Sequence, residues 1–138
     1  KAIEIKPDFA KAHSNLGNIL KDLGKLEEAE LSQRKAIEIK PDFAEAHSNL
    51  GTILRDLGNL KEAKLSYCKS IEIKPDFADY HYKLSILYSE ENDCKKAYKE
   101  INLAIKYDSK NLIYQGELNR LKFITDEYEN ENYYTNQL

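Results

Sequence analysis

Apolar residues recur every three or four positions along most of the chain. In residues 10–40 they form two sets, separated by a short connection. The first set is Ala12, Leu16, Ile19, Leu20 and Leu23, and the second includes Leu26, Ala29, Ala36 and Ile37. This spacing places each set on one face of a helix with 3.6 residues per turn. The pattern therefore predicts two amphipathic helices, each with an apolar face in a core.

The pair of helices is repeated along the chain. Shifting the sequence by 34 positions aligns residues 1–34 with residues 35–68 with only eight differences. The phrase Lys-Pro-Asp-Phe-Ala begins at Lys6, Lys40 and Lys74, and the next return of the period has Ser109 in place of the proline. Such a period indicates tandem helical hairpins, in which terminal copies are the most divergent. The sequence predicts an all-α solenoid of antiparallel helix hairpins.

Turn residues mark where each predicted helix ends. Gly24 and Gly58 stand between the two helices of their copies, and Asn92 stands there in the third copy. Glycine, and after it asparagine, tolerates the left-handed conformation that closes many helices. A proline and then an aspartate follow the second helix of each hairpin. Because aspartate is a good N-cap, we expect Asp8, Asp42 and Asp76 to cap the helices after them.

Small residues stand where the two helices of a hairpin are expected to approach each other. The expected pairs are Gly17 with Ala29, Gly51 with Ala63 and Ser85 with Ala97. Larger side chains at these positions would increase the distance between the helix axes.

The period divides the chain into six parts. We expect the end of an incomplete preceding repeat in residues 1–9, repeats in 10–43, 44–77 and 78–111, a capping helix in 112–128 and a mobile tail in 129–138. Ala2, Ile3 and Ile5 would lack part of their cover, so we expect self-association through this end, by contacts that close a ring or extend a filament. We interpret the chain, which has no methionine, as a piece of a longer protein or a processed one.

These features together resemble the tetratricopeptide repeat family. The family's marker positions hold His13, Leu16, Gly17, Leu20, Ala29, Ala36 and Pro41 in the first complete copy, and His47, Leu50, Gly51, Leu54, Ala63, Tyr67 and Pro75 in the second. Histidine replaces the usual tryptophan, and Gln33 occupies a position where a large apolar residue is usual. The resemblance implies a right-handed superhelix, with first helices lining a concave groove.

Composition narrows the classes of function. The formal net charge is only −3, so a nucleic-acid partner bound through phosphate neutralisation is not expected. No apolar run approaches the roughly 18–20 residues of a membrane span, so we expect no membrane partner. Cys68 and Cys94 form no CxxC pair, and we expect reduced thiols in a cytoplasmic protein.

The repeat pattern offers no candidate for catalysis or metal binding. His13, His47 and His81 are equally spaced, but equivalent positions on packed helices lie about 8–10 Å apart, too far to share one metal ion. The cysteines fall on second helices and the histidines on first helices, so no nucleophile and base are paired. We predict no enzyme activity, no cofactor and no metal site, and we interpret Ser14 and Ser48 as groove-lining positions.

The concave groove is the predicted binding site. The phrase Ala-His-Ser-Asn-Leu-Gly, with Asp-Leu-Gly after it, is similar to the repeats of O-linked N-acetylglucosamine transferases. In those repeats asparagines hold the peptide backbone and nearby aspartates touch side chains, which implies that Asn15 and Asn49 contact backbone beside Asp22 and Asp56. The other groove candidates are Asn18, Thr52, Tyr82 and Lys83. The alternative is that asparagine is only a consensus residue of an exposed helix.

Two hypotheses about function stay open. In the first, the protein is a protein–protein interaction scaffold that binds an extended peptide or partner segment in the groove, either alone or as the recruiting module of a larger protein. In the second, it is a structural module that assembles through its repeat ends and has no dedicated groove ligand. A carboxylate clamp, which some family members build from lysines and an arginine, is mostly missing. Those positions hold Ser14, Asn15, Asn49, Asp79 and Lys83.

Overall fold

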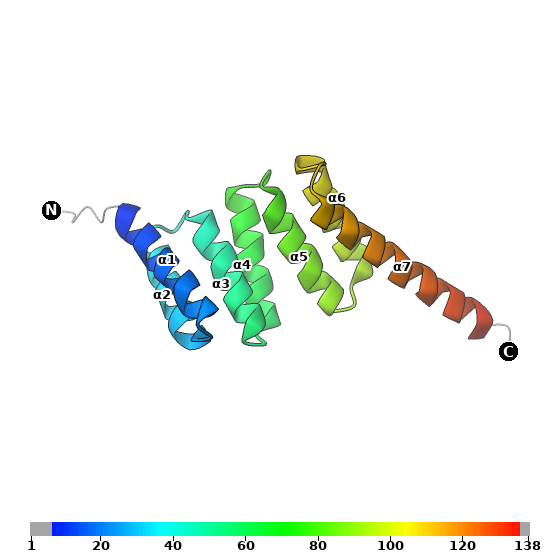
Figure 1. The fold of residues 1–138 in the computed structure, drawn as a ribbon, viewed down its shortest axis with the longest axis horizontal. Coiled ribbons are helices and arrows are strands. Elements are labelled where there is room, and N and C mark those ends of the chain that lie inside the picture. The colour runs from blue at the N-terminus through cyan, green and yellow to red at the C-terminus, as the bar shows by residue number, and fades with distance from the viewer. Residues whose placement is uncertain (1–6, 136–138) are drawn as a thin grey trace. The chain divides into compact units, whose positions relative to one another are not determined.

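The computed structural model describes the backbone of residues 7–135 and the side chains of residues 8–126. The described backbone forms seven α-helices and no β-strand (Figure 1). The helices are α1 (Pro7–Asp22), α2 (Leu26–Ile39), α3 (Ala44–Asp56), α4 (Leu60–Ile73), α5 (Ala78–Glu90), α6 (Cys94–Tyr107) and α7 (Leu112–Thr135). The all-α helical repeat fold predicted from the sequence is confirmed.

The helices belong to two compact units. The first, residues 1–76, contains the hairpins α1–α2 and α3–α4, and α2 also packs against α3. The second, residues 77–138, contains the hairpin α5–α6 and the helix α7, which packs against α6. Each unit therefore has its own core.

Left-handed residues close the first helix of every hairpin. Gly24, Gly58 and Asn92 have φ angles of 77°, 83° and 60°, so the sequence prediction is confirmed at all three positions. At the first turn, the N–H of Gly24 donates to the carbonyl of Lys21, and the N–H of the next residue donates to the carbonyl of Leu20, both at 2.9 Å. These two bonds satisfy carbonyl groups that the helix end would otherwise leave unpaired.

The predicted aspartate N-caps are wrong. The N-cap residues of α3 and α5 are Phe43 and Phe77, and neither helix has a side-chain cap. Asp8 lies within the first turn of α1. Before α3, the N–H of Phe43 donates to the carbonyl of Lys40 at 3.0 Å. This bond closes a turn that has Pro41 and Asp42 as its central residues, the arrangement in which proline fixes the first central φ angle. The aspartate therefore lies one residue too early to cap the helix.

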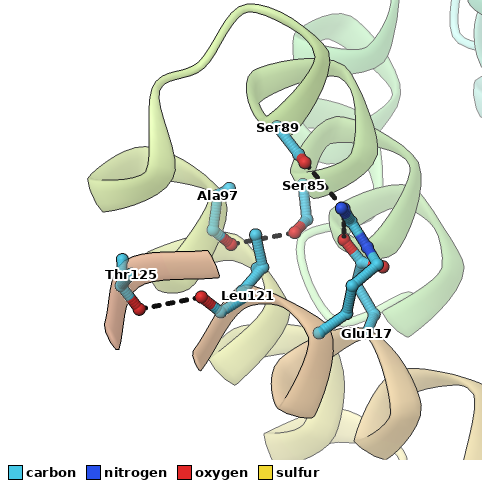
Figure 2. Close-up of polar contacts among 7 residues, drawn as sticks. Ser85, Ser89, Ala97, Glu117, Leu121 and Thr125 are labelled. Carbon is cyan, nitrogen blue, oxygen red and sulfur yellow. Dashed lines mark hydrogen bonds and ion pairs between the residues drawn. The ribbon is translucent and has the colours of Figure 1, made fainter. Parts of the chain in front are cut away.

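The close approach of paired helices is confirmed in the second and third hairpins. A Cβ atom added to Gly51 would lie 2.7 Å from the ring of Tyr67 and 3.2 Å from the carbonyl oxygen of Ala63. The hydroxyl of Ser85 donates to the carbonyl of Ala97 at 2.9 Å (Figure 2). Gly51 thus leaves room for the ring of Tyr67 on the second helix, as well as for Ala63.

In the first hairpin the neighbour of the small residue is different. A Cβ atom on Gly17 would lie 2.6 Å from Nε2 of Gln33, and Gln33 is fully buried. The equivalent residues of the next two hairpins, Tyr67 and Ile101, are also fully buried. The same repeat position therefore fills each hairpin core, with an amide in the first copy, a phenol in the second and an aliphatic side chain in the third.

A pair of glycine substitutions tests this close approach. Gly51→Ala is expected to destabilise the protein by about 1 kcal/mol, because overpacking costs about 1–3 kcal/mol and better helix propensity returns about 0.5–1 kcal/mol. Gly116→Ala is the matched control, since a Cβ atom there meets nothing within 4 Å. It should stabilise the protein by about 0.5–1 kcal/mol. Urea denaturation measures both, and shifts of the same sign would contradict the packing.

The last helix is longer than predicted. It continues to Thr135, so residues 129–135, which we expected to be a tail, have a helical backbone. A helix that is already formed gains one hydrogen bond for each residue that it adds, and this segment has no glycine or proline to stop it. Residues 136–138 of the predicted tail lie outside the described residues.

Polar side chains of α7 add to its contacts with the other helices of the second unit. Leu121 is fully buried against Ala97, Ile101 and Ala104. Arg120, the residue before Leu121, donates from Nη2 to the hydroxyl of Ser89 at 2.6 Å and forms an ion pair with Glu117 (Figure 2). The hydrogen bond to this carboxylate raises the pKa of Arg120, although burial lowers it.

Candidate peptide-binding groove

The first helices α1 and α3 carry matching polar residues on one face. In α1 these are Asn15, Asn18 and Asp22, and in α3 they are Asn49, Thr52 and Asp56. Spacings of three and four residues place each set on one side of its helix. The helices also contact each other, within the first unit. The structure therefore brings the six first-unit candidates onto two neighbouring helices.

Asparagines at the same repeat position differ in their surroundings. Asn15 is exposed, whereas Asn49 is half-buried and donates from Nδ2 to the hydroxyl of Ser14 at 3.3 Å. The backbone carbonyl of Ser14 accepts a second bond, 2.9 Å long, from Nε2 of Gln33. Ser14 thus joins α1 to both α2 and α3.

The interpretation of two serines as groove-lining residues is wrong. Ser14 and Ser48 are each only 1% exposed, so a ligand in the groove cannot reach their hydroxyl groups. Each serine directly precedes a groove asparagine, and one step along a helix turns a side chain by about 100°. That rotation directs the serines into the packed side of the helix. The sequence interpretation overlooked this rotation.

The middle groove residues are held by the second helices. Nε2 of Gln33 donates to the side-chain oxygen of Asn18 at 3.2 Å, and the hydroxyls of Thr52 and Tyr67 lie 3.0 Å apart. Burial raises the pKa of Tyr67, while its hydrogen bond to Thr52 acts in the opposite direction. The phenol therefore stays protonated at neutral pH. Each hairpin fixes its own groove residue with its own partner.

Sequence reasoning missed Gln33 and Tyr67 as supports of the groove, although the sequence contains a signal for them. Among the eight positions that differ between the first two copies, two change together: Asn18 with Gln33 becomes Thr52 with Tyr67. The structure joins the members of each pair by a hydrogen bond. A paired exchange of this kind indicates contact.

Carboxylates stand at the ends of both groove helices. Asp22 is the last residue of α1 and Asp56 is the last residue of α3, and both are exposed. A negative charge at a helix C-terminus is unfavourable by about 0.3–1 kcal/mol. Asp22 has one weak partner, Lys21, whose Nζ lies 3.9 Å away. The C-terminal ends of α1 and α3 therefore carry exposed negative charge.

The two remaining candidates lie in the second unit. Tyr82 is half-buried, and its ring centre lies 5.0 Å from that of Tyr114, a residue of α7. Lys83 is half-buried as well, and its Nζ lies 3.0 Å from the carboxylate of Asp79. Their contact with a ligand stays a prediction.

The histidines make packing and hydrogen-bond contacts. Nε2 of His47 lies 2.8 Å from the carbonyl oxygen of Pro41. His81 is buried, its Nδ1 lies 2.8 Å from Oε2 of Glu100, and its ring stacks on Tyr107. Among residues with described side chains, no three of His, Cys, Asp or Glu are grouped as metal ligands would be. None of the described helices is long and apolar enough to cross a bilayer.

A hollow that is separate from the polar faces of α1 and α3 is lined by residues of α2, α3 and α4. It has a volume of about 510 Å³, with Leu50 and Leu65 among its apolar residues and Arg34 among its charged ones. Burial lowers the pKa of Arg34, but Glu30 and Glu62 together raise it above its ordinary value. The ion pair of Arg34 with Glu62 joins α2 to α4 beside the hollow. This hollow was not predicted from the sequence.

Family models match the chain in three overlapping stretches. Models described as tetratricopeptide repeat match residues 1–30 and 44–77, and a model described as TPR repeat matches residues 17–54. No curated protein sequence matches the chain.

Solved structures share the fold at low sequence identity. The first TPR of Spaghetti (RPAP3), bound to the HSP90 peptide SRMEEVD, has a TM-score of 0.84 and 14% identity over 91% of this chain and 99% of that chain. The first TPR domain of human RPAP3 has a TM-score of 0.84 and 16% identity, over 91% and 98% of the two chains. MamA has a TM-score of 0.79 and 20% identity, over 88% and 71%. These likenesses show the fold alone, and the three family models support a tetratricopeptide repeat assignment for residues 1–77.

Proposed function

We propose that this protein is a non-catalytic interaction module whose first unit binds an extended peptide along α1 and α3. The observation that carries the proposal is the repetition of one polar pattern on neighbouring helices. Asn15 and Asn49 occupy the same position of that pattern, one exposed and one half-buried. A ligand with a regular backbone would meet the same chemical groups twice.

The expected spacing suits an extended chain. Packed helices lie about 8–10 Å apart, and an extended or polyproline chain rises about 3.1–3.4 Å per residue. Successive asparagines would then meet backbone groups about three residues apart. A primary amide can donate to a peptide carbonyl and accept from a peptide N–H. Binding would depend little on the ligand's side chains at these two points.

The carboxylates of Asp22 and Asp56 favour a ligand that has a basic residue at one end. Asp22 and Asp56 lie at the same end of their helices and are exposed. A lysine or arginine of the ligand near them would relieve the unfavourable charge at each helix C-terminus. We therefore expect ligands with a basic residue at this end of the groove.

The ligand differs in charge from the peptide held by one structural neighbour. The RPAP3 domain was solved with the HSP90 peptide SRMEEVD, which is rich in acids. On this face of the first unit the carboxylates of Asp22, Glu45 and Asp56 outnumber the basic residue Lys11, so the net charge there is negative. An acidic peptide is therefore not the proposed ligand, although a peptide in a TPR groove is the same kind of complex.

The sequence similarity to O-linked N-acetylglucosamine transferase repeats supports the same mode of backbone recognition, in a module that recruits partners for a larger protein. Its proposed location is the cytosol, where thiols such as the exposed Cys68 stay reduced. The structural alternative, assembly without a groove ligand, predicts no peptide affinity at all.

Substitution of the two asparagines tests the proposal. The probe is a peptide selected on the parent protein from a random library of ten-residue peptides. Asn15→Ala with Asn49→Ala should weaken its binding by about 1–3 kcal/mol, because each lost hydrogen bond is worth about 0.5–1.5 kcal/mol. Isothermal titration calorimetry measures the dissociation constant. Asn119→Ala, at an exposed asparagine of α7, is the matched control and should leave the constant unchanged.

Asn15→Ala alone separates binding from stability. Asn15 is exposed, so its loss should not change the melting temperature, whereas Asn49→Ala also removes the bond to Ser14. A double variant that binds the peptide as tightly as the parent would identify the asparagines as surface consensus residues. The same result would favour the structural alternative.

A further inference from the structure

The buried side chain of Gln33 has one favourable orientation. Its Nε2 donates to the carbonyl of Ser14 at 2.9 Å and to Oδ1 of Asn18 at 3.2 Å. Its Oε1 is buried and has no hydrogen-bond partner among the described residues. Turning the amide by 180° would place Oε1 against the carbonyl oxygen of Ser14 and leave the NH₂ group without an acceptor. Gln33 therefore presents donors, and not an acceptor, to α1.

This orientation decides which part of the Asn18 amide is left for a ligand. Oδ1 of Asn18 already accepts from Gln33, so Nδ2 is the free end of the amide. Nδ2 has no hydrogen-bond partner among the described residues. It is open to solvent, because Oε1 of Gln33 is the only buried side-chain polar atom without a partner in that part of the chain. Asn18 therefore offers hydrogen-bond donors to the groove.

The equivalent residue of the next copy offers an acceptor. Oγ1 of Thr52 donates its only hydrogen to the carbonyl of Ser48 at 3.3 Å, and it lies 3.0 Å from the hydroxyl of Tyr67. The phenol must then donate to Thr52. This agrees with the hydrogen bond between Tyr67 and Arg55, since a guanidinium only donates. A ligand that bonds to Thr52 therefore has to donate.

Both positions are open to a ligand inside a stack of helices. Asn18 and Thr52 are half-buried. Thr52 stays half-buried although α2 packs against α3, so a helix that precedes a hairpin does not cover this position. Ala2, Ile3 and Ile5, through which we expected self-association, lie outside the described residues, and the comparison with Thr52 does not depend on them.

The two positions lie beside the expected path of the peptide backbone. Asn18 and Thr52 each follow a groove asparagine by three residues, about 4.5 Å further along the helix. A peptide that crosses the two helices at Asn15 and Asn49 would therefore bring side chains, rather than its backbone, to Asn18 and Thr52.

We infer that the first unit selects peptides with a carboxamide side chain, of asparagine or glutamine, opposite Asn18 and a basic side chain opposite Thr52. This inference rests on the proposed peptide-binding function. A carboxamide oxygen accepts from Nδ2 of Asn18, and it is preferred to a carboxylate because this face has a negative net charge. A lysine or arginine donates to Oγ1 of Thr52, on the helix face that also carries Asp56.

The spacing of the helices sets the spacing of these two ligand residues. Packed helices lie about 8–10 Å apart, and an extended chain rises about 3.3 Å per residue. The carboxamide and the basic residue should therefore be about three positions apart. Ten-residue peptides selected on the parent protein from a random library should carry this pair, and selected peptides without it would overturn the inference.

Exchange of the hydrogen-bonded pair tests the role of Asn18. Asn18→Thr with Gln33→Tyr gives the first hairpin the pair of the second, so its groove position should change from a donor to an acceptor. The probes are a selected peptide and the same peptide with its carboxamide residue replaced by an apolar residue of similar size, methionine for glutamine or leucine for asparagine. Isothermal titration calorimetry of the parent should give a Kd about two- to tenfold higher for the apolar peptide, the effect of one net hydrogen bond. The exchanged variant should bind both peptides with the same Kd.

Lys25→Asn is the matched control for the exchange. It also replaces a residue of the first copy with its equivalent in the second, but at an exposed position after α1. The ratio of the two Kd values should stay that of the parent. A ratio that falls to one in this variant, or that persists in the exchanged variant, would overturn the role of Asn18.

Hydrogen exchange of side-chain amides, followed by NMR, tests the orientation of Gln33 on the parent alone. The Nε2 hydrogens of Gln33 should exchange slowly with water and the Nδ2 hydrogens of Asn18 rapidly, until the selected peptide slows the exchange of the latter. Slow exchange at Asn18 in the free protein would overturn the inference, and so would equal Kd values of the parent for the two probe peptides. The proposed function survives these results if Asn15→Ala with Asn49→Ala still weakens binding. A parent that binds no peptide would overturn both.

Discussion

Tyr67→Ala is expected to destabilise the first unit by about 3–5 kcal/mol, the usual cost of removing a large buried aromatic side chain. The ring of Tyr67 is fully buried, and it fills the space beside Gly51 that a larger residue would occupy. Its hydroxyl also lies 3.0 Å from that of Thr52. The substitution therefore removes both the packing and the hydrogen bond of the α3–α4 hairpin.

Two further variants divide this effect into its parts. Leu65→Ala, on the same helix but 63% exposed, should change the stability by no more than about 0.5 kcal/mol. Tyr67→Phe keeps the ring and should cost only about 0.5–1.5 kcal/mol. Urea denaturation measures all three variants. A small loss for Tyr67→Ala, close to that of Leu65→Ala, would show that the ring does not hold the hairpin together.

The phenol also makes stability depend on alkaline pH. Burial raises the pKa of Tyr67 in the folded state above the ordinary value of 10.0. The protonated hydroxyl therefore contributes its full stabilisation below about pH 10, and this contribution is lost as the pH rises through the folded pKa. The difference in the free energy of unfolding between the parent and Tyr67→Phe should therefore become smaller between about pH 10 and the folded pKa of Tyr67. A constant difference would contradict the buried position of the hydroxyl.

Leu121→Ala is expected to destabilise the second unit by about 2–5 kcal/mol. Leu121 is fully buried, and the cavity that it leaves would lie between α7 and α6. Phe123→Ala, two residues further along α7, removes a larger side chain that is 66% exposed. It should change the stability by no more than about 0.5 kcal/mol. Urea denaturation with hydrogen exchange of the α7 amides should show faster exchange only for the first variant.

The opposite result would place α7 differently. If Phe123→Ala cost more than Leu121→Ala, the outer face of α7 would be the covered one. The contact between Arg120 and Ser89 would then not form. The two substitutions therefore test which side of the last helix packs.

The fold was predictable because its signals are local and repeated. A single left-handed glycine is weak evidence, but Gly24, Gly58 and Asn92 recur at one period between two amphipathic segments. The N-caps were not predictable in this way. An aspartate after a proline fits both a cap and a turn centre, and only the bond from Phe43 to Lys40 decides between them.

The groove was only partly predictable, because a helical pattern gives the face of a residue but not its partners. It placed Asn15, Asn49, Asp22 and Asp56 on the polar side of the first helices. It could not show that Ser14 is enclosed by neighbours from two other helices, since those contacts join residues far apart in the chain. Burial of this kind depends on tertiary packing rather than on periodicity.

The paired exchange between the first two hairpins has a consequence for engineers who build longer arrays from this sequence. Either copy can serve as the building block, but positions 18 and 33 must be transferred with their own partner. Gln33→Tyr alone would place a phenol opposite the larger side chain of Asn18 in the first hairpin. In the second hairpin the phenol of Tyr67 meets the shorter side chain of Thr52. A consensus that averages the copies position by position mixes two solutions to the same packing problem. Arrays that inherit Asn18 with Gln33, or Thr52 with Tyr67, as a unit should melt at higher temperatures than mixed arrays.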